Sequence, residues 1–342
     1  MVQPARERRA PSGRRSMVRR RRTLAAAIVA LGLLAIVLFL ELGSDPSPPP
    51  AVRYKAVAVP SSTTTTTTTT ALPSPPYAVS DETLTFVDPS RPTPPRGDVA
   101  GSATRTLETE IFKPVGLTGP LPLIVFGHGW NSNPGVYEQL LDEWAQAGYL
   151  VAAPVFPDSS NLLPGTPISD YGEQAEDLSF VITAMLKGPA GPVDPQKIVV
   201  AGHSDGGTDV ALMALNPTFR DPRVAAYLSL SSEIPDGMAG PWGAASDVPL
   251  FVAVGTEDEY GLLPRSTQVF DVADQPKVLV VAQGGDHLGS YLGPSSEEVA
   301  MRNETLRFLS AALRSPTPTS ASLGAALAPT GDPSLVVTSG AP

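Results

Sequence analysis

Short apolar runs alternate with segments of helical periodicity between residues 100 and 314, and this alternation predicts the fold. Strands apolar on both faces that alternate with helices are typical of a parallel sheet covered on two sides, which is an α/β fold class. The weaker alternation over 105–112 fits an antiparallel edge strand placed before the parallel core. The predicted strands are 121–126, 150–153, 198–201, 225–230, 250–254 and 278–282, and the predicted helices are 136–147, 173–186, 208–215 and 297–313.

The first part of the chain has a different pattern. Residues 1–22 contain nine arginines and form a basic head, which runs into Leu24 to Leu40, seventeen residues without charge or proline. A basic flank before such a run favours a cytoplasmic head, a membrane anchor over 23–43 and a catalytic domain outside the cytoplasm. A cleaved signal peptide and a secreted protein are the alternative, although the nearest small-x-small site, Ala56-Val57-Ala58, lies far downstream.

Two segments have little to bury. Residues 44–95 carry twelve of the 38 prolines and the threonine tract Thr63 to Thr70, so they are predicted to be a disordered tether. Residues 315–342 have a similar Pro, Ser, Thr and Ala content and are predicted to be a disordered tail. The catalytic domain is therefore expected over 96–314.

Charge and cysteine content narrow the function classes. The net charge is −10 although the head is basic, so the remainder is strongly acidic and nucleic acid is not expected as a partner. The chain has no cysteine, which excludes disulfides, thiolate zinc sites and a cysteine nucleophile. No metal site is predicted, and a monomer is expected.

One Gly-x-Ser-x-Gly pattern, Gly202-His203-Ser204-Asp205-Gly206, lies between a strand signal and a helix signal. This is the setting of a nucleophile elbow, a sharp turn in which side chains at the glycine positions would collide. Ser204 is therefore the predicted nucleophile. The backbone N–H of Asp205 is a predicted oxyanion donor, since the N-terminus of the following helix favours developing negative charge.

A serine nucleophile needs a base, and the chain has three histidines. His203 adjoins the serine, so its side chain is expected to point away from that of Ser204. His128 follows a strand and is expected to brace a loop. His287 lies just past the last core strand, after Gly284-Gly285, and is the predicted base.

The third member should be a carboxylate that orients the imidazole. Asp258, in the turn after the strand 250–254, is the leading candidate, and Glu233 after the preceding strand is its rival. With Asp258 the chain order is Ser204, Asp258, His287, the order typical of α/β-hydrolases.

The loop after the first parallel strand should supply the second oxyanion donor, and the N–H of Trp130 is the residue predicted there. Its indole is a candidate wall of the substrate pocket. The segment 233–248 is too short for a lid domain, so an open cleft lined by Met238 and Trp242 is expected.

Residues 103–314 resemble the α/β-hydrolase superfamily, particularly its dienelactone-hydrolase-like, platelet-activating-factor-acetylhydrolase-like and chlorophyllase- or cutinase-like esterases. The resemblance is carried by the elbow and by residues 105–114, 122–129, 148–154 and 176–182. It implies a Ser204, Asp258 and His287 triad, a small-molecule or lipid ester substrate and no cofactor. Dienelactone hydrolases proper use a cysteine nucleophile, so that activity is not implied.

The expected function is carboxylic-ester hydrolysis through an acyl-enzyme. Three alternatives stay open at this point. They are acyl transfer to a cell-envelope lipid or sugar, peptide hydrolysis, and a non-catalytic module that binds the envelope.

Overall fold

The computed structural model describes residues 76–238, 240–243, 246–327 and 334–340. The predicted basic head, the predicted anchor over 23–43 and the tether before residue 76 lie outside the described residues. Within the described ranges, none of the helices combines the length and the apolar character needed to cross a bilayer.

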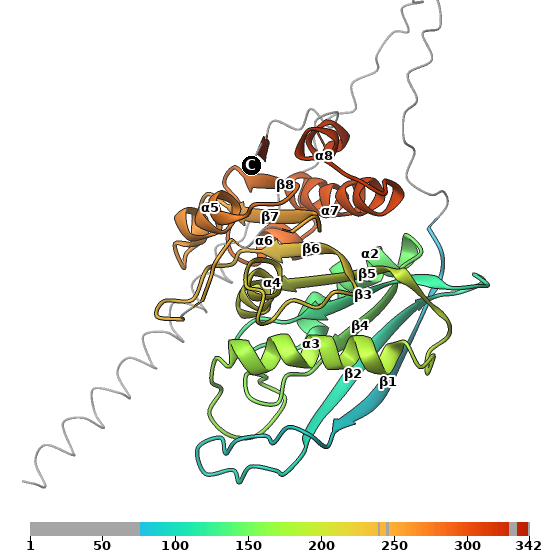
Figure 1. The fold of residues 1–342 in the computed structure, drawn as a ribbon, viewed down its shortest axis with the longest axis vertical. Coiled ribbons are helices and arrows are strands. Elements are labelled where there is room, and N and C mark those ends of the chain that lie inside the picture. Colours follow the sequence, from blue (N-terminus) through green and yellow to red (C-terminus); the bar gives the residue numbers. More distant parts are fainter. Residues whose placement is uncertain (1–75, 239, 244–245, 328–333, 341–342) are drawn as a thin grey trace, which may run out of the picture. The chain divides into compact units, whose positions relative to one another are not determined.

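The described strands form one sheet of nine strands in the order β1-β2-β4-β3-β5-β6-β7-β8-β9 (Figure 1). Six neighbouring strands, β4 to β8 in that order, are parallel, whereas β1, β2 and β9 pair antiparallel at the two sides. The strands are β1 (Val79–Asp88), β2 (Arg105–Pro114), β3 (Leu121–Gly127), β4 (Leu150–Pro154), β5 (Val193–His203), β6 (Val224–Leu230), β7 (Leu250–Gly255), β8 (Lys277–Ala282) and β9 (Leu335–Gly340).

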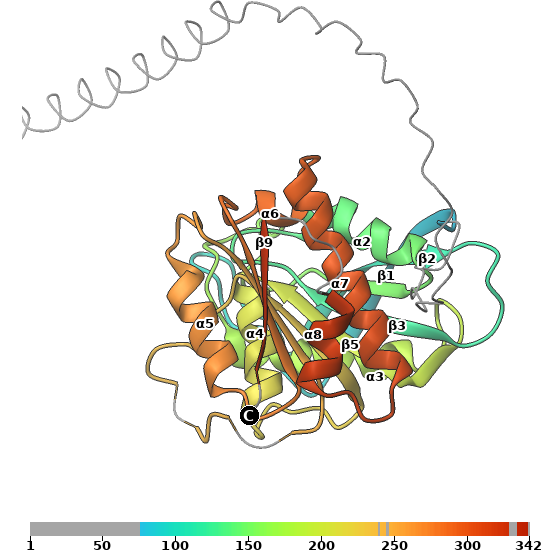
Figure 2. The same ribbon diagram turned by 90° about the horizontal axis from the view of Figure 1, so that it is seen from above.

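Helices cover both faces of the sheet (Figures 1 and 2). Successive residues of a strand point to opposite faces, so Val200 of β5 packs with one buried cluster and Val199 with the other. The first cluster includes α3 (Tyr171–Met185), α4 (Asp205–Leu215) and α5 (Leu262–Val272). The second includes η1 (Pro134–Tyr137), α2 (Glu138–Gln146), α6 (Gly289–Leu292), α7 (Ser296–Arg314) and α8 (Ser320–Leu327). The doubly covered, mostly parallel sheet predicted from the sequence is confirmed.

The start of the domain differs from the prediction. β2 is not an edge strand, because β1 pairs with it along its whole length, from Val79 opposite Pro114 to Asp88 opposite Arg105. The N–H of Tyr77 also bonds the carbonyl oxygen of Gln146. The folded domain therefore begins well before residue 96. β1 was not predicted because most of its residues are exposed and it follows a proline-rich stretch.

The prediction of a disordered tail over 315–342 is wrong for the part of it that forms α8 and β9. α8 buries Leu323 and Leu327 in the second core cluster, and β9 extends the sheet, with Leu335 opposite Ala282 of β8. A leucine pair four residues apart gives α8 one apolar edge, a local pattern that the average composition of the tail conceals. α5 was likewise absent from the predicted helices.

A buried charge cluster holds the N-terminal strands to the rest of the domain. Arg105 of β2 is completely buried. Its Nη1 donates to Asp158 Oδ2 at 2.6 Å, in the loop after β4, and its Nε donates to Asp177 Oδ1 at 2.7 Å, in α3. Removing one partner of a buried ion pair leaves uncompensated charge, which costs far more than breaking an exposed pair.

We expect Arg105→Met to lower the free energy of unfolding by about 3–5 kcal/mol, because Asp158 stays buried after its guanidinium partner is lost and Asp177 keeps only its pair with Arg91. Urea unfolding followed by circular dichroism measures the change. Lys197→Ala is the matched control, since it breaks the partly exposed pair with Asp194 and should cost under about 1 kcal/mol. Equal losses of unfolding free energy in the two variants would contradict the stabilising role assigned to the buried Arg105 ion pairs.

Candidate active site

Ser204 occupies the turn between the end of β5 and the start of α4, with φ 58° and ψ −121°. A positive φ is strained for a non-glycine residue and is typical of functional positions. The turn is possible because of its glycines. A Cβ on Gly202 would collide with the carbonyl oxygen of Gly206, and a Cβ on Gly206 would collide with that of Gly127. The predicted elbow geometry is therefore present.

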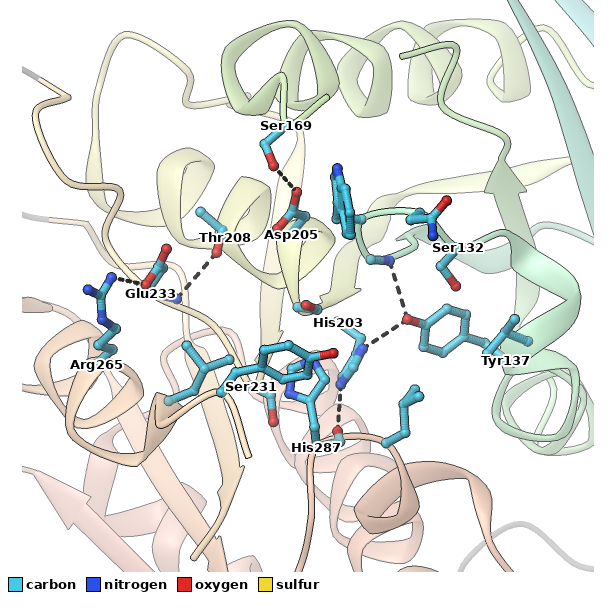
Figure 3. Close-up of a pocket in the computed structure, with 18 of the residues that line it drawn as sticks. Ser132, Tyr137, Ser169, His203, Asp205, Thr208, Ser231, Glu233, Arg265 and His287 are labelled. Carbon is cyan, nitrogen blue, oxygen red and sulfur yellow. Dashed lines mark hydrogen bonds and ion pairs between the residues drawn. The ribbon is translucent and has the colours of Figure 1, made fainter. Parts of the chain in front are cut away.

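Asp205 is the first residue of α4, so its backbone N–H has no partner within the helix. Its side chain is held by Ser169, whose Oγ donates to Oδ2 at 2.6 Å (Figure 3). Burial raises the pKa of Asp205, and the bond from Ser169 opposes that rise. The carboxylate therefore has its own partner, and the backbone N–H lies in the first turn of α4, next to Ser204.

The structure brings His287 and Asp258 together. His287 follows β8, Asp258 follows β7, and the His287 Nδ1 lies 2.7 Å from Asp258 Oδ2, with both residues buried. Burial by itself would raise the pKa of Asp258, but the hydrogen bond and charge of His287 outweigh it and hold that pKa below its usual value. When the His287 ring is neutral, Nδ1 donates to this ionised carboxylate, and Nε2 is then the acceptor nitrogen.

Glu233, the rival acid, has other partners. Its carboxylate forms an ion pair with Arg265, and its N–H donates to Thr208 Oγ1 at 3.3 Å (Figure 3). Of the two candidate acids, the structure places Asp258 against His287.

Ser204 and His287 line the same cavity, which has a volume of about 630 Å³. Trp130, which is half-exposed, is one of the residues that line it. Met238 and Trp242 do not line this cavity. Instead the Trp242 indole donates to the Met238 carbonyl oxygen at 3.1 Å and packs against the core. The lining also includes Asn131, Ser132, Val136, Tyr137, Asn161, Ser169, Asp205, Thr208, Ser231, Glu233, Tyr260, Leu262, Arg265 and Leu288.

The other two histidines are buried, and His203 also contributes to the lining of the cavity. His128 bonds the Gly129 carbonyl oxygen through Nδ1 and accepts from the Phe156 N–H through Nε2, which braces the loop after β3. Burial lowers the pKa of His128 to about 4 and that of His203 to about 3. Both imidazoles are therefore neutral at physiological pH.

Several residues of the site were missed by the sequence analysis. Glu259 accepts a hydrogen bond from the His287 N–H at 3.1 Å, and the Tyr260 ring contacts the His287 ring with centroids 4.6 Å apart. Their position directly after Asp258 was the available signal. Tyr137 bonds His203 at 2.9 Å, and nothing in the sequence signals that contact, because it joins residues 66 positions apart.

Comparison with known proteins gives evidence on the fold and on the class of activity. Residues 102–232 match the model of the chlorophyllase family. A ferulic acid esterase from Streptomyces cinnamoneus is structurally similar, with a TM-score of 0.57 and 19% identity over 79% of this chain and 98% of that one. The chain has the α/β-hydrolase fold. No match is found among the curated proteins.

The structural likeness establishes the fold, as predicted from the elbow and the strand pattern. The family match covers the segment that contains Trp130, Ser204 and Asp205, and it supports an esterase-type activity.

Proposed function

We propose that this protein is a serine carboxylic-ester hydrolase in which Ser204 is the nucleophile, His287 the base and Asp258 the residue that orients His287. The observation that carries the proposal is the 2.7 Å bond from His287 to Asp258, formed at the cavity that Ser204 also lines. Such an arrangement leaves the His287 Nε2 as the proton acceptor in a site that holds a serine in an elbow.

The reaction proceeds in two steps. Ser204 Oγ bonds to the ester carbonyl carbon while its proton passes to His287 Nε2, and the N–H groups of Asp205 and Trp130 stabilise the oxyanion. The ester C–O bond then breaks, and His287 returns the proton to the departing alcohol. Water attacks the acyl-enzyme by the same route and releases the acid. Asp258 stabilises the imidazolium that forms in each step.

The substrate proposed is a soluble ester of short or medium acyl length. The described residues between β6 and β7 form no helix or strand that could cover the cavity. The cavity wall includes polar residues such as Asn131, Asn161 and Ser169 as well as apolar ones. A polar, uncovered wall does not favour a long alkyl chain.

A panel of esters of graded acyl length, assayed on the full chain, tests this proposal. We expect turnover of soluble short-chain esters with no rate increase when the substrate passes its solubility limit. Added alcohols should divert little acyl-enzyme from water. Predominant capture by an alcohol would establish an acyltransferase, and cleavage of peptides without ester turnover would establish a peptidase.

We also propose that residues 23–43 anchor the protein in a membrane with the catalytic domain outside the cytoplasm. The basis is the arginine-rich head that precedes Leu24 to Leu40. The full chain should fractionate with membranes, and protease added outside intact cells should release the domain by cutting between residue 44 and β1. A soluble mature form whose N-terminus lies after Gly43 would instead establish a cleaved signal peptide.

A further inference from the structure

Three buried hydrogen bonds link the two sides of the active site (Figure 3). The Gly129 N–H donates to the Tyr137 hydroxyl at 3.2 Å, that hydroxyl lies 2.9 Å from His203 Nδ1, and His203 Nε2 lies 2.8 Å from the carbonyl oxygen of His287. Tyr137 and His203 are each 1% exposed. The series is called the Tyr137–His203 bridge below.

Each proton in the bridge has only one possible position. A carbonyl oxygen can only accept, so His203 Nε2 must carry a proton. His203 is neutral because burial lowers its pKa to about 3, so its Nδ1 carries none and accepts from the Tyr137 hydroxyl. The lone pairs of that hydroxyl receive the Gly129 N–H. All of these buried groups are therefore satisfied in one orientation.

The ends of the bridge are the two loops on which the proposed chemistry depends. Gly129 precedes Trp130, the proposed oxyanion donor, and a Cβ on Gly129 would lie 3.0 Å from the Ser204 Cβ. His287 is at the other end, and its ring centroid is 4.6 Å from that of His203. Because His203 is also the residue before Ser204, the bridge connects both loops to the elbow itself.

We propose that His203 and Tyr137 are positioning residues, which hold the oxyanion loop and the His287 loop at fixed distances from Ser204. The inference rests on the proposed function. Displacements of about 1 Å between reacting groups can lower the rate about 100-fold. Loss of the Tyr137–His203 bridge, which connects the His287 loop to the oxyanion loop, is therefore expected to lower kcat. The Gly-x-Ser-x-Gly pattern allows any residue immediately before the serine, and in this chain His203 occupies that position and forms the Tyr137–His203 bridge.

The test compares His203→Leu, His203→Gln and Tyr137→Phe in the full chain. Glutamine can accept from Tyr137 and donate to the His287 carbonyl, whereas leucine can do neither. We expect His203→Leu to lower kcat about 10- to 100-fold with KM changed less than about threefold, and His203→Gln to recover most of that loss. Tyr137→Phe should lower kcat by a similar factor. The double variant Tyr137→Phe/His203→Leu should lose little more than either single one, because each breaks the same bridge.

Tyr227→Phe is the matched control. Tyr227 is a buried tyrosine of β6 whose hydroxyl has no hydrogen-bond partner among the described residues, so its removal should leave kcat unchanged. Thermal unfolding verifies that each variant is folded, and Tyr137→Phe keeps the proposal testable if His203→Leu does not fold. A kcat of wild-type size in Tyr137→Phe, or equal losses in the glutamine and leucine variants, would overturn the proposal.

Nitrogen-15 NMR of the histidines gives a readout that does not depend on activity. His203 should show a protonated Nε2 and a bare Nδ1, and Tyr137→Phe should perturb the Nδ1 signal. The opposite tautomer would contradict the bridge while leaving the proposed function intact. A wild-type chain that neither cleaves esters nor reacts with a fluorophosphonate would contradict the proposed function, and the positioning role would fall with it.

Discussion

Ser204→Ala should lower kcat by about 10⁴- to 10⁶-fold, since loss of the nucleophile leaves only the rate that oxyanion donors and substrate binding supply. The reason lies in the elbow, where Ser204 has φ 58° between β5 and α4 and lines the cavity with His287. Hydrolysis of a chromogenic short-chain ester measures the loss. Because the expected residual rate is very low, the assay needs enzyme purified free of host esterases.

A fluorophosphonate probe provides the control for this variant. It should label the wild-type chain once, at Ser204, and should not label Ser204→Ala. Ser169→Ala changes another serine of the same cavity and should still be labelled. Undiminished ester hydrolysis by Ser204→Ala would falsify the catalytic assignment as a whole.

Asp258→Asn should lower kcat by about 10⁴-fold while the fold is retained. The carboxylate accepts the proton of His287 Nδ1 at 2.7 Å, and an amide that presents its NH₂ group there would favour the tautomer with the proton on Nε2. His287 could then no longer accept the serine proton. Steady-state kinetics gives kcat, and thermal unfolding verifies that the variant is folded.

Glu233→Gln is the matched change at the rival acid. Glu233 pairs with Arg265, and the Arg265 side chain is 43% exposed, so the variant should lose less than about tenfold in kcat. Any loss should appear mainly in KM, because Glu233 lines the cavity. If Glu233→Gln showed the large loss of kcat and Asp258→Asn stayed active, Glu233 after β6 would be the carboxylate that orients His287, and the assignment of Asp258 would be wrong.

The parallel core was predictable because each of its strands is apolar on both faces, a pattern set by burial under two layers of helices. β1, α8 and β9 were not predictable on that basis. β1 is mostly exposed, and both it and the C-terminal elements lie in segments whose average composition resembles a linker. Their order comes from pairing with β2 and β8, contacts that a local pattern does not contain.

In the candidate site, too, some features could be predicted from local sequence and others depend on the tertiary structure. The elbow is a local turn, so the spacing of Gly202, Ser204 and Gly206 was enough to predict it. Trp242 was placed in the cavity wall because it lies in a loop beside the cleft, yet the packing of that loop turns its indole to the Met238 carbonyl. The direction of a loop side chain depends on its neighbours in space and not on its position in the chain.

By itself, the sequence determined the α/β class, the parallel strands and the turn that holds Ser204, because these depend on local periodicity and local sterics. Only the tertiary structure decided between Asp258 and Glu233 as the partner of His287 and joined Tyr137 to His203. Both results are contacts between residues 29 and 66 positions apart, respectively. Such contacts arise when sheet and helices bring strand ends together, which no local pattern encodes.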